Sequence, residues 1–189
     1  MKPIFSVLAG IIFTIGYIPY IIAILKKGAK PAKASWVIWL SLDMITIASM
    51  FVMNTLNGQM IGAVIGAWIV VILAFKYGAP GWTLLDKLSI LGAIIGIVIW
   101  QLFDSPLLGI LINLGVTFIG SIPTFISAWE DPGREDKLAW ILFLISCICA
   151  LIAVPDWDLA NAAQPITFFV IEATVVVIIF LRKPTNLAK

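Results

Sequence analysis

The sequence contains no histidine, and only 12% of its 189 residues are charged. Histidine is the commonest metal ligand in proteins and the commonest acid–base group near neutral pH. Its absence therefore argues against most metal-dependent and acid–base enzymes. The two cysteines, Cys147 and Cys149, are two positions apart in an apolar stretch, so they point to different sides of a helix. We interpret them as apolar side chains, with no disulfide framework and no metal site.

Hydrophobic residues make up 62% of the chain, and its mean hydropathy is +1.12. A soluble domain cannot bury so much apolar surface, so we expect an all-α protein embedded in a lipid bilayer. Seven segments come close to the roughly 20 residues that are needed to cross a bilayer core. These segments are 4–25, 35–53, 59–76, 88–103, 106–129, 138–154 and 163–181.

Basic residues are divided unequally between the two faces that seven such spans define. Eleven of the twelve Lys and Arg residues fall on one face, and only Lys2 falls on the other. The eleven are Lys26, Lys27, Lys30, Lys33, Lys76, Lys87, Arg134, Lys137, Arg182, Lys183 and Lys189. Positive charge collects on the cytoplasmic side of membrane proteins. We therefore expect a multi-pass protein of the cytoplasmic (inner) membrane with its N-terminus outside and its C-terminus in the cytoplasm.

Two stretches of the chain share a pattern at a constant separation of 104 residues. The matching pairs are Gly16 and Gly120, Pro19 and Pro123, and Trp36 and Trp140. A fixed spacing across unusual residue types indicates an internal repeat. The pattern predicts a first three-helix repeat over 1–78, a linker helix over 79–105, and a second three-helix repeat with a cytoplasmic tail over 106–189. Because the linker helix restores the orientation, the two repeats are parallel.

Within each repeat the motif is short. Gly16-x-x-Pro19 is followed by Lys30-Pro31-x-x-x-Ser35-Trp36, and Gly120-x-x-Pro123 is followed by Trp140. This plan resembles the PQ-loop superfamily, whose seven-helix members include the SWEET sugar transporters and the Pnu-type vitamin transporters. Within it the chain is most similar to a group of bacterial membrane proteins of about this length. The resemblance spans nearly the whole chain and implies a SWEET-like arrangement, with the two Gly-x-x-Pro motifs as paired hinges of an inner gate. The alternative is that Pro19 and Pro123 only reflect the higher frequency of proline in membrane helices.

The sequence also departs from that superfamily. Tyr20 and Thr124 follow the two prolines, where the superfamily has glutamine. The sugar transporters carry asparagines in the third and seventh helices, whereas Trp68 and Glu172 stand at the matching positions here. These differences argue against a sugar as the substrate.

Two acidic residues fall within predicted membrane spans, where carboxylates are costly and usually face protein or a water-filled cavity. Asp43 shares a helical stripe with Trp36 and Trp39, because the three are spaced by three and four residues. Such a stripe is expected to line a cavity rather than to face lipid. Glu172 lies at the centre of the last span, where it could bind a cationic solute or carry a coupling proton. The alternative is a protonated structural carboxyl that is bonded to a neighbouring helix.

Three further residues complete the candidate site. Asn113 begins a polar stripe with Thr117 and Ser121, for which hydrogen bonding between helices is the alternative. Trp68 lies in mid-membrane, and lining the cavity and simple packing are equally good interpretations. Trp140 is the repeat partner of Trp36. The candidate substrate-binding residues are therefore Trp36, Trp39, Asp43, Trp68, Asn113, Trp140 and Glu172.

These observations predict a transporter that moves a small polar or aromatic metabolite by alternating access, with passive and proton-coupled transport both open. The alternative is a receptor or accessory subunit that binds without transporting, because fold does not fix function. No nucleophile motif or metal constellation points to an enzyme, and we expect neither a cofactor nor a nucleic-acid partner. The charged loop over 130–137 reads as a solvated turn. One chain already holds both repeats, so a monomer and a homo-oligomer are both compatible with the sequence.

Overall fold

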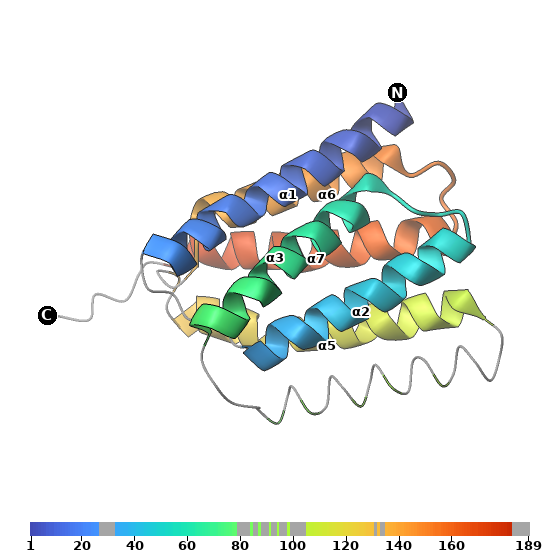
Figure 1. Ribbon diagram of the computed structural model, residues 1–189. Coiled ribbons are helices and arrows are strands. Elements are labelled where there is room, and N and C mark those ends of the chain that lie inside the picture. Colours follow the sequence, from blue (N-terminus) through green and yellow to red (C-terminus); the bar gives the residue numbers. More distant parts are fainter. Residues whose placement is uncertain are drawn as a thin grey trace, which may run out of the picture.

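The computed structural model describes residues 1–26, 33–78, 105–130, 132 and 135–182, with single positions at 84, 87, 91, 94 and 98. Within this part of the chain the structure is all-helical (Figure 1), and six long helices are assigned. They are α1 (Lys2–Lys26), α2 (Lys33–Val52), α3 (Gly58–Tyr77), α5 (Pro106–Glu130), α6 (Lys137–Ala153) and α7 (Leu159–Leu181). The expected linker helix over 79–105 lies outside the described residues, apart from those single positions and residue 105.

Helix starts in this chain are set by polar side chains that accept the unpaired N–H groups of a first turn. Asn57 accepts from the backbone of Met60 at the start of α3, at 2.9 Å. Asp158 does the same at the start of α7, where it accepts from Asn161 N at 2.8 Å. This cap explains why α7 begins at Leu159 and so includes residues that were expected to belong to the preceding turn.

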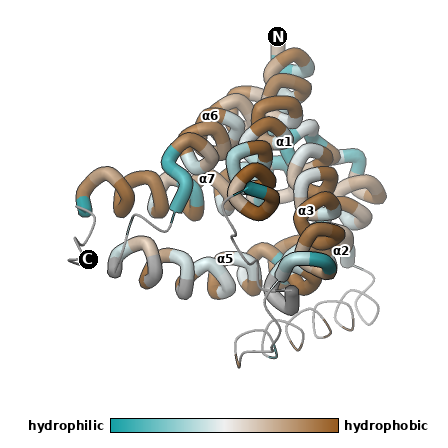
Figure 2. The backbone as a smooth tube through the Cα atoms, turned by 60° about the vertical axis from the view of Figure 1, so that its left-hand side comes forward, coloured by the Kyte–Doolittle hydropathy of each residue, from teal (hydrophilic) through white to brown (hydrophobic). Residues whose placement is uncertain are grey.

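Four of the described helices are long and apolar enough to cross a membrane, judged by length and composition: α1, α3, α7 and the segment Pro106–Ile126 of α5. α2 and α6 contain shorter apolar stretches, Trp36–Val52 and Lys137–Ala153. The helices are predominantly hydrophobic, as their brown colour in Figure 2 shows, and many of their apolar side chains are exposed. On α1, for example, Ile11, Ile15 and Ile18 are all exposed. Exposing so much apolar surface to water would cost a large free energy, so these features indicate a membrane protein.

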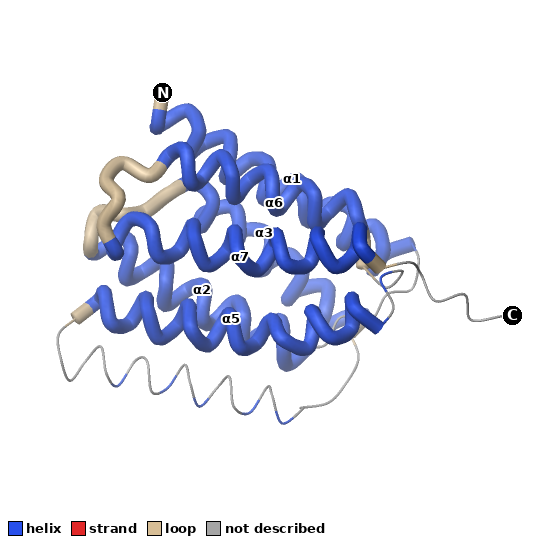
Figure 3. The backbone as a smooth tube through the Cα atoms, turned by 180° about the vertical axis from the view of Figure 1, so that it is seen from behind, coloured by secondary structure: helices blue, strands red, loops and turns tan. Residues whose placement is uncertain are grey.

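The six helices form a closed ring. α1 packs against α3 and α6, α2 packs against α3 and α5, and α7 packs against α5 and α6. Going round the ring, the order is α1, α3, α2, α5, α7 and α6, as can be followed in Figures 2 and 3. Exchanging α1 with α5, α2 with α6 and α3 with α7 gives the same six pairings. The ring can therefore be divided into two units of three helices that pack in the same way.

Small residues let α1 and α3 approach each other closely. A side chain at Gly62 would collide with the backbone carbonyl of Gly10, and one at Gly66 would overlap the ring of Tyr17. On the other side of α1, the Ser146 hydroxyl of α6 donates to Ala9 O at 2.7 Å. Small-residue contacts and single hydrogen bonds of this kind are the usual means of joining helices in a bilayer, where there is no hydrophobic drive between them.

The two ends of the ring differ in charge. One end, here called the basic end, contains Lys26, Lys76, Lys137 and Arg182, because α1, α3 and α7 finish there and α6 begins there. The other end, here called the opposite end, contains the N-terminus and Lys2. The described residues thus repeat the charge asymmetry of the whole sequence.

Candidate binding cavity

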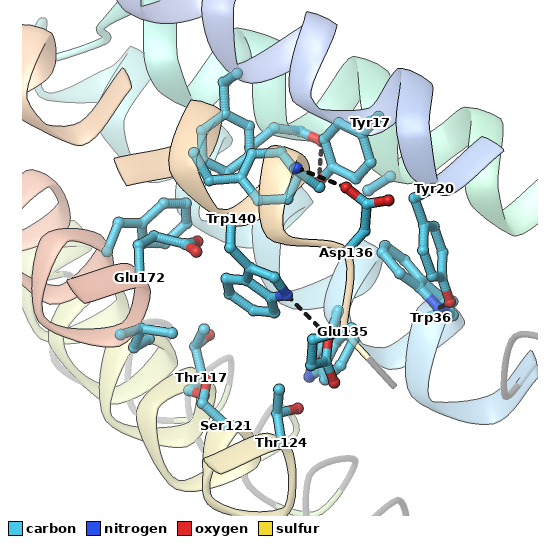
Figure 4. Close-up of a pocket in the computed structure, with 18 of the residues that line it drawn as sticks. Tyr17, Tyr20, Trp36, Thr117, Ser121, Thr124, Glu135, Asp136, Trp140 and Glu172 are labelled. Carbon is cyan, nitrogen blue, oxygen red and sulfur yellow. Dashed lines mark hydrogen bonds between the residues drawn. The ribbon is translucent and has the colours of Figure 1, made fainter. Parts of the chain in front are cut away.

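The ring encloses a cavity of about 520 Å³, to which all six described helices contribute. The lining residues are Phe13, Tyr17, Tyr20, Ala23, Trp36, Trp39, Asp43, Ala63, Ala67, Thr117, Ser121, Thr124, Glu135, Asp136, Ala139, Trp140, Phe143, Phe168, Ile171 and Glu172. Figure 4 shows most of these side chains. Tyr20, Trp36 and Glu135 lie near the ends of their helices at the basic end, so the cavity runs from the middle of the ring to that end.

Five of the seven candidate residues lie on this cavity, namely Trp36, Trp39, Asp43, Trp140 and Glu172. Helix geometry brings the first three together from α2, as their spacing predicted. The other two candidates do not line it. Trp68 points away from the ring interior and is 48% exposed, although its repeat partner Glu172 is 7% exposed. Asn113 is fully buried one turn beyond Thr117, past the inner limit of the cavity.

Six pairs of lining residues are separated by 104 positions. They are Phe13 and Thr117, Tyr17 and Ser121, Tyr20 and Thr124, Trp36 and Trp140, Trp39 and Phe143, and Ala67 and Ile171. Equivalent faces of equivalent helices therefore meet at the cavity. Their chemistry differs, because α1 presents three aromatic rings where α5 presents three hydroxyls. One wall is thus aromatic, and the wall related to it is polar.

The aromatic side chains form a continuous set of ring contacts. Trp36 lies edge-on to Trp39, with ring centroids 5.3 Å apart, and edge-on to Tyr17 at 6.2 Å. Tyr17 in turn contacts Phe143 at 5.2 Å, and Phe143 contacts Trp140 at 6.0 Å. The two repeat-related tryptophans, Trp36 and Trp140, are thereby connected through Tyr17 and Phe143. Edge-to-face pairs of this kind are favourable and hold each ring in a defined orientation.

Hydrogen-bond donors on the lining are largely used inside the protein. The Trp36 indole N–H donates to the Tyr20 hydroxyl at 3.3 Å, and the Trp140 indole N–H donates to Glu135 Oε2 at 2.8 Å (Figure 4). On α5, the Thr117 and Ser121 hydroxyls donate to backbone carbonyls one turn earlier, each at 2.9 Å. A hydroxyl that donates to its own helix has only lone pairs left to offer. At these four positions the walls therefore present aromatic faces and hydrogen-bond acceptors.

Four carboxyl groups lie on the cavity, two deep and two at the basic end. The deep pair is Asp43 and Glu172, and Glu172 Oε2 is buried without a hydrogen-bond partner among the described residues. Glu135 and Asp136 precede α6 at the basic end, where Asp136 also caps the helix by accepting from Ala139 N at 3.0 Å. Burial raises the pKa of the Glu135 carboxyl, and the hydrogen bond from Trp140 opposes that rise. None of the described residues that line the cavity is a lysine or an arginine.

At the opposite end, a chain of buried amides joins three helices. Asn57 Nδ2 donates to Gln164 Oε1 at 2.7 Å, Gln164 Nε2 donates to Gln59 Oε1 at 3.2 Å, and Gln59 Nε2 donates to Cys147 Sγ at 3.0 Å. We call these four residues the amide chain. Gln59 and Gln164 are 0% and 1% exposed. The amide chain thus connects α3, α6 and α7 by hydrogen bonds at the opposite end of the ring, away from the cavity.

The four expected hinge residues lie in continuous helix. α1 runs unbroken through Gly16 and Pro19, and α5 runs unbroken through Gly120 and Pro123. Both glycines are buried, next to residues that line the cavity.

Several lining residues could not be recognised in the sequence. Phe13 and Tyr17 belong to an almost wholly apolar helix in which no face stands out, and Tyr20 was noted only as a departure from a family pattern. The loop before α6 was interpreted as a solvated turn, which is wrong for Glu135 and Asp136, since both are half-buried and line the cavity. An aspartate directly before an apolar helix, such as Asp136, is typical of a helix N-cap. No local pattern in the sequence indicates that Glu135 lines a cavity.

The chain matches no protein-family model, no curated protein sequence and no solved structure. What it is must therefore be argued from its own geometry. Fold and cavity together define a helical membrane protein with a central chamber of aromatic and acidic side chains.

Proposed function

We propose that the chain is a SWEET-like membrane transporter of small solutes, in which the central cavity is the solute site. The observation that carries this proposal is the set of six lining pairs at a spacing of 104. Two units, α1 to α3 and α5 to α7, each supply corresponding positions to one cavity. Transporters built from repeats place their substrate site at such an interface and work by moving one unit against the other.

The charge distribution supports an orientation for this transporter. With the basic end in the cytoplasm of a bacterial inner membrane, the cavity faces inwards and the N-terminus lies outside. A cysteine placed at Asp156, in the exposed connection between α6 and α7, would then react with an impermeant maleimide in intact cells. A cysteine at Lys76 would react only after the membrane is permeabilised. The reverse pattern would contradict the orientation.

Alternating access requires that the two ends of the ring open in turn. The structure has the form expected of an inward-facing state, with the cavity at the basic end and the amide chain across the opposite end. An outward-facing state would separate the amide chain and close the basic end. The Gly16 and Pro19 pair in α1, and its repeat partner in α5, are the proposed positions where the helices bend.

The test is solute uptake by the purified protein in liposomes. We expect Asp43→Asn and Glu172→Gln to lose most of the uptake while remaining folded, and Trp68→Leu, outside the cavity, to retain it. If both acid variants transport normally, the carboxyls are structural and the site assignment is wrong. Comparing uptake with and without an imposed pH gradient separates passive from proton-coupled movement.

A second experiment separates transport from simple binding. Gln59→Cys places a second thiol in the amide chain near Cys147, so a short bis-methanethiosulfonate cross-linker, which forms reducible disulfides with both thiols, can lock the opposite end. A transporter locked in this way should stop moving solute while still binding it, and a reductant should restore movement. Cys149→Ala serves as the matched background, because Cys149 is the second free thiol of α6. A receptor would show binding and no movement, whether locked or not.

A further inference from the structure

We infer that the solute of this cavity is an organic cation: an amine or quaternary ammonium group carried on a small apolar body. The inference concerns the substrate class of the proposed transporter and in that sense rests on the proposed function. The cavity geometry that supports it, however, is independent of whether the solute is moved.

The sign of the charge on the lining is the first argument. Asp43 and Glu172 lie deep in the cavity, and Glu135 and Asp136 lie along the way in from the basic end. With no basic side chain among the described lining residues, nothing there balances these carboxyls. Clefts lined by one sign of charge attract and concentrate ligands of the opposite sign. Inside the cavity, an anionic solute would meet carboxyl groups and no basic side chain among the described lining residues.

The hydrogen-bonding groups of the lining also favour a cationic solute. The indole N–H groups of Trp36 and Trp140 and the hydroxyl hydrogens of Thr117 and Ser121 are committed to partners within the protein. The carboxyl oxygens and hydroxyl lone pairs remain available. These acceptors suit a solute that donates hydrogen bonds or carries positive charge.

Glu172 is the residue at which the inference is most specific. It is 7% exposed, and its Oε2 atom finds no hydrogen-bond partner among the described residues. A buried polar atom without a partner is costly unless something else satisfies it. Figure 4 shows the carboxyl of Glu172 on the cavity wall. A cationic centre at this position would satisfy the carboxyl within a cavity that Trp140 and other aromatic rings line.

The aromatic walls favour an organic cation over a metal ion. Ring faces attract cations through their quadrupole, most strongly for tryptophan, and cages of aromatic residues bind quaternary ammonium groups in this way. Both indole N–H groups point to internal partners, so Trp36 and Trp140 offer mainly their faces. Among the described residues, no group of three or more His, Cys, Asp or Glu could hold a metal ion. A cavity of about 520 Å³ has room for the apolar body of an organic solute.

The test compares three probes that share one ring and differ in charge: benzyltrimethylammonium, benzyl alcohol and benzoate. Binding to the protein in lipid nanodiscs is followed by quenching of tryptophan fluorescence and by the melting temperature. We expect the cation to bind at least tenfold more tightly than the neutral and anionic probes. Glu172→Gln and Trp140→Leu should each weaken the cation at least tenfold. Trp68→Leu serves as the matched tryptophan control, and its binding should be unchanged.

Three results would overturn the inference: no binding of the cation, equal or tighter binding of benzyl alcohol or benzoate, or unchanged cation binding in Glu172→Gln. Glu172→Asp guards against a folding artefact, because it keeps the carboxyl and should retain part of the affinity. Liposome uptake of the same probes separates the two proposals. Cation binding that depends on Glu172 but is not accompanied by uptake would refute transport and leave the cation class intact. Uptake of only the neutral or anionic probe would refute the cation class and leave the transport proposal intact.

Discussion

The backbone of Gly16 lies directly against the ring of Phe143, so closely that a Cβ atom on Gly16 would be 2.5 Å from Phe143 Cε1. The contact recurs between the repeat partners of these residues. A Cβ atom on Gly120 would lie 3.4 Å from Trp39 Nε1. Each glycine thus receives a cavity-lining aromatic ring from the other three-helix unit. The glycines that the sequence marks as possible hinges are therefore also points of contact between the two units.

This geometry predicts unequal effects of adding a methyl group at the two glycines. Gly16→Ala forces the half-buried Phe143 ring to shift, and overpacking of this kind costs about 1–3 kcal/mol. Gly120→Ala meets only ordinary van der Waals contact and should be tolerated. Thermal unfolding in detergent measures the difference, and Phe143→Leu in the Gly16→Ala background should recover part of the loss. Equal destabilisation by both alanines would contradict the packing described here.

The amide chain predicts strong energetic coupling between Gln59 and Gln164. Replacing either residue with leucine leaves a buried amide without its partner, which costs about 1–3 kcal/mol. Replacing both removes the two ends of the Gln59–Gln164 bond together and leaves only Asn57 and Cys147 without their partners, so the double variant should lose less than the sum of the two single losses. A double-mutant cycle on the melting transition measures this coupling. Strict additivity would show that the two amides do not interact.

Asn113 predicts a stabilising substitution. Its Oδ1 and Nδ2 atoms are buried without hydrogen-bond partners among the described residues, and the residue is 0% exposed. Asn113→Leu keeps the branched shape and the number of heavy atoms and removes the desolvation cost, so we expect stability to rise by about 1–3 kcal/mol. Ser121→Ala, on the same helix but with its hydroxyl bonded, should not raise it. A fall in stability for Asn113→Leu would mean that the amide is satisfied in the folded protein.

Glu135 predicts a pH-dependent contribution to stability at the basic end. Burial raises the pKa of its carboxyl above the ordinary value of 4.5, and the Trp140 hydrogen bond opposes the rise. The folded state therefore disfavours the ionised form. The contribution of this group is fully present below about pH 4.5 and is lost as pH rises through the higher folded-state pKa.

The melting temperature of the wild type, relative to Glu135→Gln, should accordingly fall as pH increases above about 4.5. Subtracting the Glu135→Gln profile removes the contributions of the other acids. Trp140→Phe, which deletes the opposing hydrogen bond, should move this fall to higher pH. A flat difference profile would show that Glu135 is solvated like an ordinary surface carboxyl.

Much of the architecture could be predicted from composition and spacing. Because a helix must have a certain length to cross a bilayer, six of the predicted spans lie close to the observed helices. The predicted span 4–25 corresponds to Lys2–Lys26, for example, and 106–129 corresponds to Pro106–Glu130. The predicted span 88–103 stays a prediction. Strong local signals also placed part of the cavity. Trp36, Trp39 and Asp43 share a helix face because of the helical period alone, whatever surrounds them.

Only the tertiary structure decided which faces of the apolar helices point inwards. In a membrane, lipid and neighbouring helices are equally apolar, so hydrophobic periodicity does not distinguish the two sides of α1 or α3. For that reason Phe13 and Tyr17 could not be assigned to the cavity, and Trp68 could not be excluded from it. Trp68 and Glu172 hold equivalent positions in the sequence, yet one faces outwards and the other lines the cavity. Packing around the ring brings Gly16 to Phe143 and Gln59 to Gln164, and so joins segments whose contact no local pattern encodes.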